Sequence, residues 1–417
     1  KDQVVQEYEF RKGSPFRKDH EERWREVDRQ IKIKPPEVKN QSGNVDEEWH
    51  NAVELGLNSA ALEVMTADIM RIAFPNHRKW FDPHSSGNQE DQKERDGKLR
   101  AFMSQQHIDF GFQARFKLSV KEALSHGSFV ATVDGQQLTQ VERGGKLFSV
   151  TAPVWKPISM WNAYPDPCPE VMATNLFYDG SMVFERWMKL DHLKRIPGLN
   201  LKGVEDKDHS IGGVNFKGVH LLIWKGPITI ERSRGHQVVP NVDVWVANQE
   251  KVLKAVPNDW PFPNIIFGGY ERQDVRDPYY TSPIHKNVPW HKIATRSANK
   301  FLDSIDLKTE PPVNYNENSP AFAGKEPDMS PGAKNAVANL ADVAVMDVGS
   351  PEAAFSGLQY STEQAQMGIN IDNTRAGVSS STEQTAFEVQ KKDSRAEVRT
   401  VDFLTELETH GLRPFLY

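Results

Sequence analysis

Residues 277–307, which read DPYYTSPIHKNVPWHKIATRSANKFLDSIDL, are the stretch that decides the fold. Thr281-Ser282-Pro283 is typical of a helix start, because serine can cap a first turn that does not need the N–H that proline lacks. The apolar spacing predicts a helix from 281 to about 307, with a restart at Pro289 left open. Downstream, the prolines between 308 and 359 predict turns and short strands.

This helix carries a basic stripe. Lys292, Arg296 and Lys300 are four residues apart, which places them on one face about 6 Å apart along the axis. Repeated around a ring of subunits, the stripe would form belts of positive charge matched to a phosphate backbone. A solvated face, or salt bridges with Asp303 or Asp306 of a neighbouring subunit, are the alternative interpretations. The residues expected to lie elsewhere for packing are Ile293, Ala294 or Ala298, Leu302 and Ile305.

Upstream, helical patterns give way to β-prone runs. The charged segment 1–34 predicts an exposed helix with a narrow apolar seam of Phe16, Trp24, Val27 and Ile31. Residues 46–48 begin a longer helix, and 92–125 predicts another that ends at Gly127. Between 129 and 246, five short runs separated by turn residues predict strands. The tryptophans here are typical of core aromatics, although they leave a carbohydrate-active enzyme open as an alternative. They include Trp155, Trp161, Trp187, Trp224 and Trp245.

One tetrapeptide occurs twice after the proline-rich segment. Residues 361–364 and 381–384 both read STEQ, which matches the capping box of a helix N-terminus. Two helices are therefore expected to begin near 361 and 381, separated by a short break at 376–380. The chain as a whole is expected to be α+β.

Composition limits the function classes. The 417 residues predict two or three folded units, and their net charge of −6 is the wrong sign for a protein that coats nucleic acid through its whole surface. The single cysteine, Cys168, excludes a disulfide within the chain and a Cys-built zinc site. No apolar run approaches the roughly 18 residues that span a bilayer. Because the sequence begins at Lys1 and ends in mid-pattern, we expect it to be part of a longer protein.

Enzyme signatures are missing from the sequence. Residues 144–146, Gly-Gly-Lys, lack the flanking glycine and hydroxyl residues of a phosphate-binding loop, so they predict a hairpin turn. Nucleophile-elbow, zinc-peptidase and dinucleotide-binding motifs do not occur. Carboxylate pairs such as Asp303/Asp306 and Glu406/Glu408 are better explained as solvated helix faces. We therefore expect no catalytic residues, no metal and no cofactor.

The order of these parts resembles the portal protein, or head-to-tail connector, of tailed bacteriophages, most similar to that of the short-tailed phages. The resemblance is by motif from residue 261 onward and by general character over 1–260. The residues that carry it are Pro261-Phe262-Pro263 to Tyr270, the 277–283 stretch, Asn299, Pro311-Pro312, Pro331-Gly332, Gly377 to Thr382, Thr385 to Val389, and Leu412-Arg413-Pro414. Within the first 260 residues, Trp155-Lys156-Pro157 to Asp166-Pro167 also resembles the family.

The resemblance implies a portal fold. Residues 1–266 would form a wing that is helical first and β-rich from about 127. The remaining parts would be a first stem helix with its lead-in (267–308), a clip (309–360), a second stem helix (361–376), a tunnel loop (377–382) and a long helix returning to the wing (383–417), with the chain incomplete beyond it.

It also implies a function in the virion and, during assembly, in the host cytoplasm. Portal proteins form twelve-subunit rings at one capsid vertex, through which double-stranded DNA is packaged and ejected. The implied partners are further copies of the chain, the large terminase subunit, the scaffold and major capsid proteins and tail adaptor proteins, with no membrane. A minor capsid or adaptor protein is an alternative.

The implied site residues fall into three groups. Lys292, Arg296 and Lys300 would line the stem channel. The tunnel loop, short and rich in serine, would contain Val378, Ser379, Ser380, Ser381 and Thr382. The acidic clip would dock terminase and adaptors through Glu310, Glu317, Glu326, Asp328, Asp342 and Asp347.

Overall fold

The computed structural model describes residues 1–35, 51–75, 81, 83, 89–143, 146–167, 180–211, 214–232, 235–258, 264–274, 276–316, 330–337, 351–368 and 401–416. The chain folds into two compact units. Unit 1 is Lys1–Arg25, Met65–His285 and Glu383–Tyr417, and unit 2 is Glu26–Val64 and Lys286–Thr382. Both helices and sheets are present, which confirms the α+β class. Among the described residues, no helix combines the length and hydropathy needed to cross a bilayer.

The N-terminal part of the chain is helical. Its helices are α1 (Asp2–Gly13), α2 (Pro15–Ile31), α3 (Leu57–Ala73), α4 (Gln89–Asp109) and α5 (Phe112–His126). The prediction of a single exposed helix over 1–34 was wrong, because there are two helices and the charged residues Arg11 and Arg17 are buried. Trp24 and Val27, which were predicted to lie on a narrow apolar seam, are buried as expected. The helix expected from 46–48 begins only at Leu57 within the described residues, and 92–125 is divided between α4 and α5. Gly127 ends α5 at φ 88°, as predicted.

Two antiparallel sheets lie in unit 1. One has the order β2-β1-β9 and the other β3-β4-β6-β7-β8, with β5 paired to β6. All five predicted runs fall in strands, and Arg143 pairs with Lys146 across the predicted hairpin turn. The strands are β1 (Ser128–Arg143), β2 (Lys146–Ile158), β3 (Ala163–Pro165), β4 (Met182–Met188), β5 (Lys207–Ile211), β6 (Val214–Arg232), β7 (Gly235–Ala247), β8 (Lys251–Pro257) and β9 (Ile265–Gly269); the short helices are η1 (Met160–Asn162) and α6 (Leu190–Leu193).

Aromatic side chains fill the core of unit 1. Trp155 and Trp224 are buried, and Trp161 and Trp245 pack against a buried cluster that includes Trp24. These four tryptophans are therefore core aromatics, as expected.

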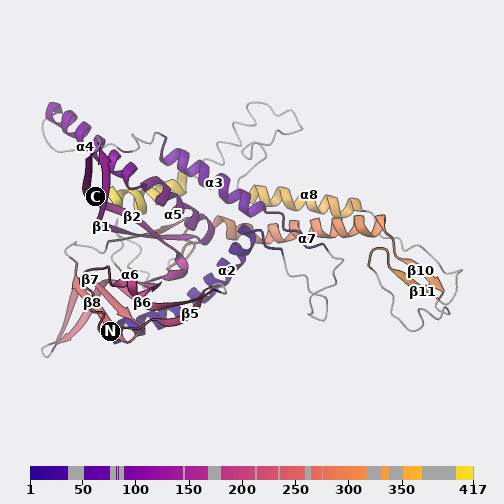
Figure 1. Ribbon diagram of the computed structural model, residues 1–417. Helices are drawn as coiled ribbons and strands as arrows, with labels where there is room; N and C mark the ends of the chain where they lie inside the picture. The colour runs from indigo at the N-terminus through magenta and orange to yellow at the C-terminus, as the bar shows by residue number, and fades with distance from the viewer. Residues whose placement is uncertain are drawn as a thin grey trace. The chain divides into compact units, whose positions relative to one another are not determined.

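Unit 2 contains a helical hairpin, which Figure 1 shows as two helices side by side. It pairs α7 (Pro283–Thr309), whose first turn belongs to unit 1, with α8 (Pro351–Gly368). The helices are antiparallel, because the ring centroids of Phe301 and Phe355 are 5.5 Å apart while Gly368 faces Asn287. Two short strands at the end of the hairpin, β10 (Val313–Asn316) and β11 (Lys334–Val337), pair in parallel.

The start of α8 differs from the start that was predicted near residue 361. α8 begins at Pro351, and Ser361 lies in its interior, where the hydroxyl donates to the carbonyl of Gly357 at 2.7 Å. The capping-box interpretation of residues 361–364 was therefore wrong, and that of 381–384 lies outside the described residues. Near the C-terminus, residues 401–407 are helical and continue through a π-helical turn (Glu408–Leu412) into α10 (Arg413–Leu416).

Candidate functional site: the polar faces of α7

The start of α7 follows the sequence prediction. The hydroxyl of Ser282 accepts a hydrogen bond from the backbone N–H of His285 at 3.0 Å and donates to the carbonyl of Leu124 at 2.6 Å. The first bond is a side-chain N-cap. The helix then runs to Thr309 without a restart at Pro289.

The three residues of the basic stripe are all exposed on α7. Lys292 Nζ lies 3.3 Å from Glu26 Oε1 at the end of α2. Within the described part of the chain, Arg296 and Lys300 form no ion pair. Ala294 and Ala298 pack inward as expected, but the expectation for two larger residues was wrong, because they are exposed: Ile293 by 48% and Ile305 by 39%.

A second polar row lies on a neighbouring face of α7 and was missed by sequence reasoning. Its members recur every four residues, and all but the last are buried. We call it the polar ladder; it consists of Asn287, His291, Thr295, Asn299 and Asp303. The spacing was visible in the sequence, but polar residues at helical spacing do not reveal whether solvent or protein meets them.

Segment 51–58 and the end of α2 provide hydrogen-bond partners for most of the polar ladder. Asn299 takes both backbone groups of Val53, accepting from its N–H at 2.8 Å and donating to its carbonyl at 3.0 Å. Asn51 donates to Asp303 at 2.7 Å through its backbone and to Asp306 at 2.6 Å through its amide. Those two carboxylates, candidate salt-bridge partners for a neighbour, are therefore already bonded within the chain.

At the N-terminal end of the ladder, the bonding continues through three buried amides. Asn287 donates to Asn58 at 2.8 Å, and Asn58 donates to Gln30 of α2 at 2.6 Å. The NH2 group of each buried amide thus has an acceptor, which limits the cost of removing it from water, whereas Asn287 Oδ1 and both ring nitrogens of His291 have no hydrogen-bond partner among the described residues.

A cluster of charged groups lies beside the polar ladder. The Glu54 carboxylate, whose side chain is 1% exposed, accepts from Arg29 Nη1 at 2.9 Å and lies 3.1 Å from Nδ1 of the fully buried His291. Burial raises the pKa of Glu54 and lowers the pKa of His291 to about 4. Burial also opposes ionisation of Glu26, but hydrogen bonds from Arg29 and Lys292 outweigh it and lower the pKa of that carboxyl.

The neutral state of His291 predicts acid sensitivity of unit 2. Its folded-state pKa of about 4 lies below the unfolded value of 6.5, so its contribution is complete above pH 6.5 and is lost as the pH falls toward 4. The expected loss is up to about 3 kcal/mol, partly offset by Glu54, whose raised pKa favours the folded state at low pH. Urea unfolding at several pH values measures this loss of unfolding free energy. His291→Gln should make the unfolding free energy depend less on pH. If the variant and the unmodified protein show parallel pH dependences, His291 is not the group responsible.

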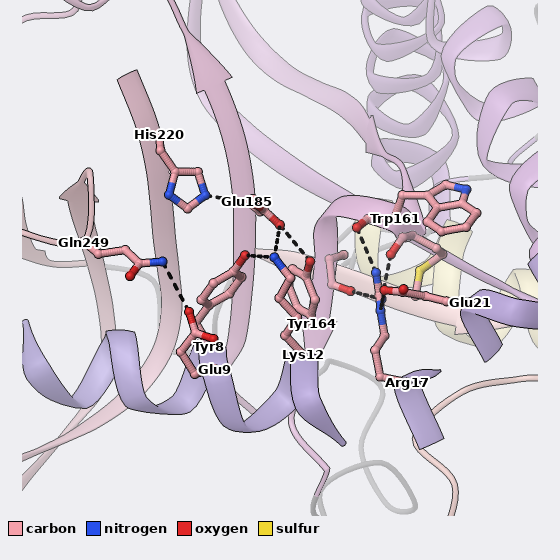
Figure 2. A network of polar contacts seen from close by, with 12 residues as sticks. Tyr8, Glu9, Lys12, Arg17, Glu21, Trp161, Tyr164, Glu185, His220 and Gln249 are labelled. Atoms are coloured by element: carbon pink, nitrogen blue, oxygen red, sulfur yellow. Dashed lines mark hydrogen bonds and ion pairs between the residues drawn. The ribbon is translucent and has the colours of Figure 1, made fainter. Parts of the chain in front are cut away.

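A separate polar network lies in unit 1, where α1 meets the larger sheet (Figure 2). Glu185 accepts from the hydroxyl of Tyr164 at 2.7 Å and lies 2.9 Å from His220 Nε2, while Lys12 donates to the hydroxyl of Tyr8 at 2.6 Å. Although burial opposes ionisation, the bonds from His220 and Tyr164 lower the pKa of Glu185 to about 2. A carboxylate held ionised in this way fits an anchor for α1 better than a general acid, which must hold a proton near neutral pH.

Unit 1 also contains a cavity of about 460 Å³ between α1 and strand β6. Its two carboxylates, Glu7 and Asp166, lie 3.1 Å and 3.7 Å from Arg11, whose side chain is 3% exposed. Trp224 forms part of the lining. Because both carboxylates are paired with one buried cation, the described lining shows no free acid and base of the kind that a glycoside hydrolase uses.

Most of the remaining predicted site residues lie outside the described residues. These are Val378, Ser379, Ser380, Ser381 and Thr382 of the expected tunnel loop, and Glu317, Glu326, Asp328, Asp342 and Asp347 of the expected clip. Glu310 is described: it is exposed just after α7, and its carbonyl accepts from the N–H of Gly332 at 2.6 Å. The described residues contain no group of three His, Cys, Asp or Glu side chains arranged to hold a metal ion.

No protein-family model and no curated protein matches the sequence. The interpretation of the site therefore depends on the residues and geometry above.

Proposed function

We propose that the chain is a portal subunit of a tailed bacteriophage, without catalytic activity, that assembles into a twelve-subunit ring at one capsid vertex. The ring conducts double-stranded DNA during packaging and ejection. A separate terminase supplies the energy, consistent with the missing phosphate-binding loop. The observation that carries the proposal is the exposed basic stripe on a helical hairpin that leads into an acidic, proline-rich excursion.

The hairpin also exposes large apolar side chains. They project at 39–58% exposure in the single chain and include Ile293, Ile305, Phe355, Tyr360 and Met367. Apolar surface of this kind on paired helices is stabilised when another protein surface covers it. In a ring, the hairpin of the neighbouring subunit would cover this apolar surface.

The other partners are those that the resemblance to portal proteins implies. The acidic clip docks the large terminase subunit and later the tail adaptors, the wing meets the scaffold and major capsid proteins, and the tunnel loop forms the constriction. The narrow basic stripe in an otherwise acidic chain lets DNA slide, because binding that neutralises many phosphates would hold it at physiological salt.

The oligomeric state tests the proposal. We expect native mass spectrometry of the purified full-length protein to give a closed oligomer near twelve copies, and negative-stain images to show rings with an axial hole. Ile293→Ser with Tyr360→Ser should shift the population toward smaller species, because the apolar surface that a neighbour covers is reduced. A monomer without rings at micromolar concentration would refute the portal function.

A further inference from the structure

The carboxylate of Glu54 contacts α7 at two steps of the polar ladder. Its Oε1 lies 3.1 Å from His291 Nδ1 and accepts from the hydroxyl of Thr295 at 3.4 Å. A carboxylate removed from water is stable only where charges and hydrogen bonds replace its hydration. Glu54 therefore fixes one face of α7 against segment 51–56.

The same carboxylate is linked to a second face of α7 through α2. Arg29 bonds Glu54 through Nη1 and Glu26 through Nη2, the latter at 3.0 Å, and Glu26 in turn holds Lys292. Lys292 follows His291 directly, so it projects about 100° further around the helix. Contacts on two faces within one turn resist rotation of α7 about its axis, whereas contacts on a single face resist it less.

The three cations of the basic stripe are therefore not equivalent. Lys292 is the last member of an alternating chain of charges, Glu54–Arg29–Glu26–Lys292, that starts in the interior of unit 2. Arg296 and Lys300 lie one and two turns further along the same face, are exposed, and have no ionic partner in the described ranges. No carboxylate among the described residues neutralises their positive charge.

We propose that Glu54 is a positioning residue for the basic stripe. Through Arg29 and Glu26 it holds Lys292, and thereby the rotation of α7, so that Arg296 and Lys300 rather than Lys292 contact DNA phosphates. The DNA contact rests on the proposed function, whereas the control of helix rotation does not.

DNA binding over a salt series tests the roles of the cations. The full-length protein is titrated with a fluorescent double-stranded DNA fragment of mixed sequence. Arg296→Gln with Lys300→Gln should flatten the dependence of affinity on salt, whereas Lys292→Gln should lower the melting temperature and leave that slope unchanged. Glu54→Gln should weaken binding although all three cations remain. A Lys292→Gln slope as flat as that of the double variant, or unchanged binding by Glu54→Gln, would overturn the inference.

A labelling experiment tests the rotation of α7 without DNA. In a Cys168→Ser background, Ala298→Cys places a thiol at a buried position of α7, 6% exposed. Adding Glu54→Gln should speed its maleimide labelling by on the order of tenfold, because the helix face opens locally. Ala61→Cys, at a 2% exposed position of α3 in unit 2, is the control for global opening of that unit and should not change. Equal labelling of Ala298→Cys with and without Glu54→Gln would refute the positioning role, even if the ring proved not to bind DNA.

Discussion

Replacing Arg17 by methionine is expected to lower the free energy of unfolding of unit 1 by about 3–5 kcal/mol. The fully buried guanidinium donates to the backbone carbonyls of Met160 and Ala163 at 2.9 Å each and of Trp161 at 2.8 Å, and its Nε donates to Glu21 at 2.7 Å (Figure 2). Methionine fills a similar volume but donates nothing. Three enclosed carbonyls would then lose this donor at once, and Glu21 would keep only its exposed pair with Arg25.

A matched control separates this burial effect from the loss of a positive charge on α2. Arg25 also pairs with Glu21, at 3.2 Å, but its side chain is 67% exposed. Arg25→Met should therefore change stability by less than about 1 kcal/mol. Guanidinium chloride unfolding followed by tryptophan fluorescence measures both, since Trp24 lies under the Arg17 guanidinium at 4.8 Å. A loss of less than about 1 kcal/mol for Arg17→Met would mean that water can replace the guanidinium.

Two buried arginines, Arg11 of α1 and Arg17 of α2, show why segment 1–34 was predicted to be exposed. The charge density of this segment is typical of a solvated surface, yet Arg11 and Arg17 are 3% and 0% exposed. Their acceptors lie far along the chain, between Met160 and Ser181. Periodicity within one segment cannot identify acceptors that only the folded sheet brings near, so it predicted the helical structure and not the burial.

Whether a serine motif correctly predicted a helix start depended on the residues that precede it in the sequence. Ser282 caps α7 because it stands directly before Pro283, the first helical residue. Ser361 begins a capping-box sequence, which Ser282 does not, but the helix already starts at Pro351, ten residues earlier. Serine, glutamate and glutamine are also tolerated within helices. The motif therefore indicates a helix without fixing its start.

The two polar rows of α7 show how far the site could be predicted. Spacing alone placed Lys292, Arg296 and Lys300 on one face, and they do lie exposed along α7. It could not distinguish Lys292 from the other two, because Glu26 is distant in the sequence and becomes a neighbour only when α2 packs near α7 within unit 2. The sequence therefore predicted which residues share a face of α7, but not which distant residues pair with them.

Replacing Gly127 by alanine is expected to cost more than about 4 kcal/mol, enough to prevent folding of unit 1. Gly127 has φ 88°, and a Cβ there would lie 2.0 Å from the carbonyl oxygen of Tyr280 and 2.9 Å from the backbone nitrogen of Ser282. Backbone atoms in a packed segment cannot move aside as a flexible side chain can. The added methyl group would push away the residues that lead into α7 and cap its first turn.

Gly198→Ala is the control that separates steric exclusion from backbone strain. Gly198 has a similar φ of 80°, but no atom lies within 4 Å of the position its Cβ would take. Only the left-handed conformation is then penalised, at about 1–2 kcal/mol. Thermal unfolding and soluble yield of the two variants measure the difference. Equal effects would mean that strain alone accounts for Gly127, whereas a folded Gly198→Ala beside an unfolded Gly127→Ala would show that close contact with residues 280–282 holds the start of α7 in place.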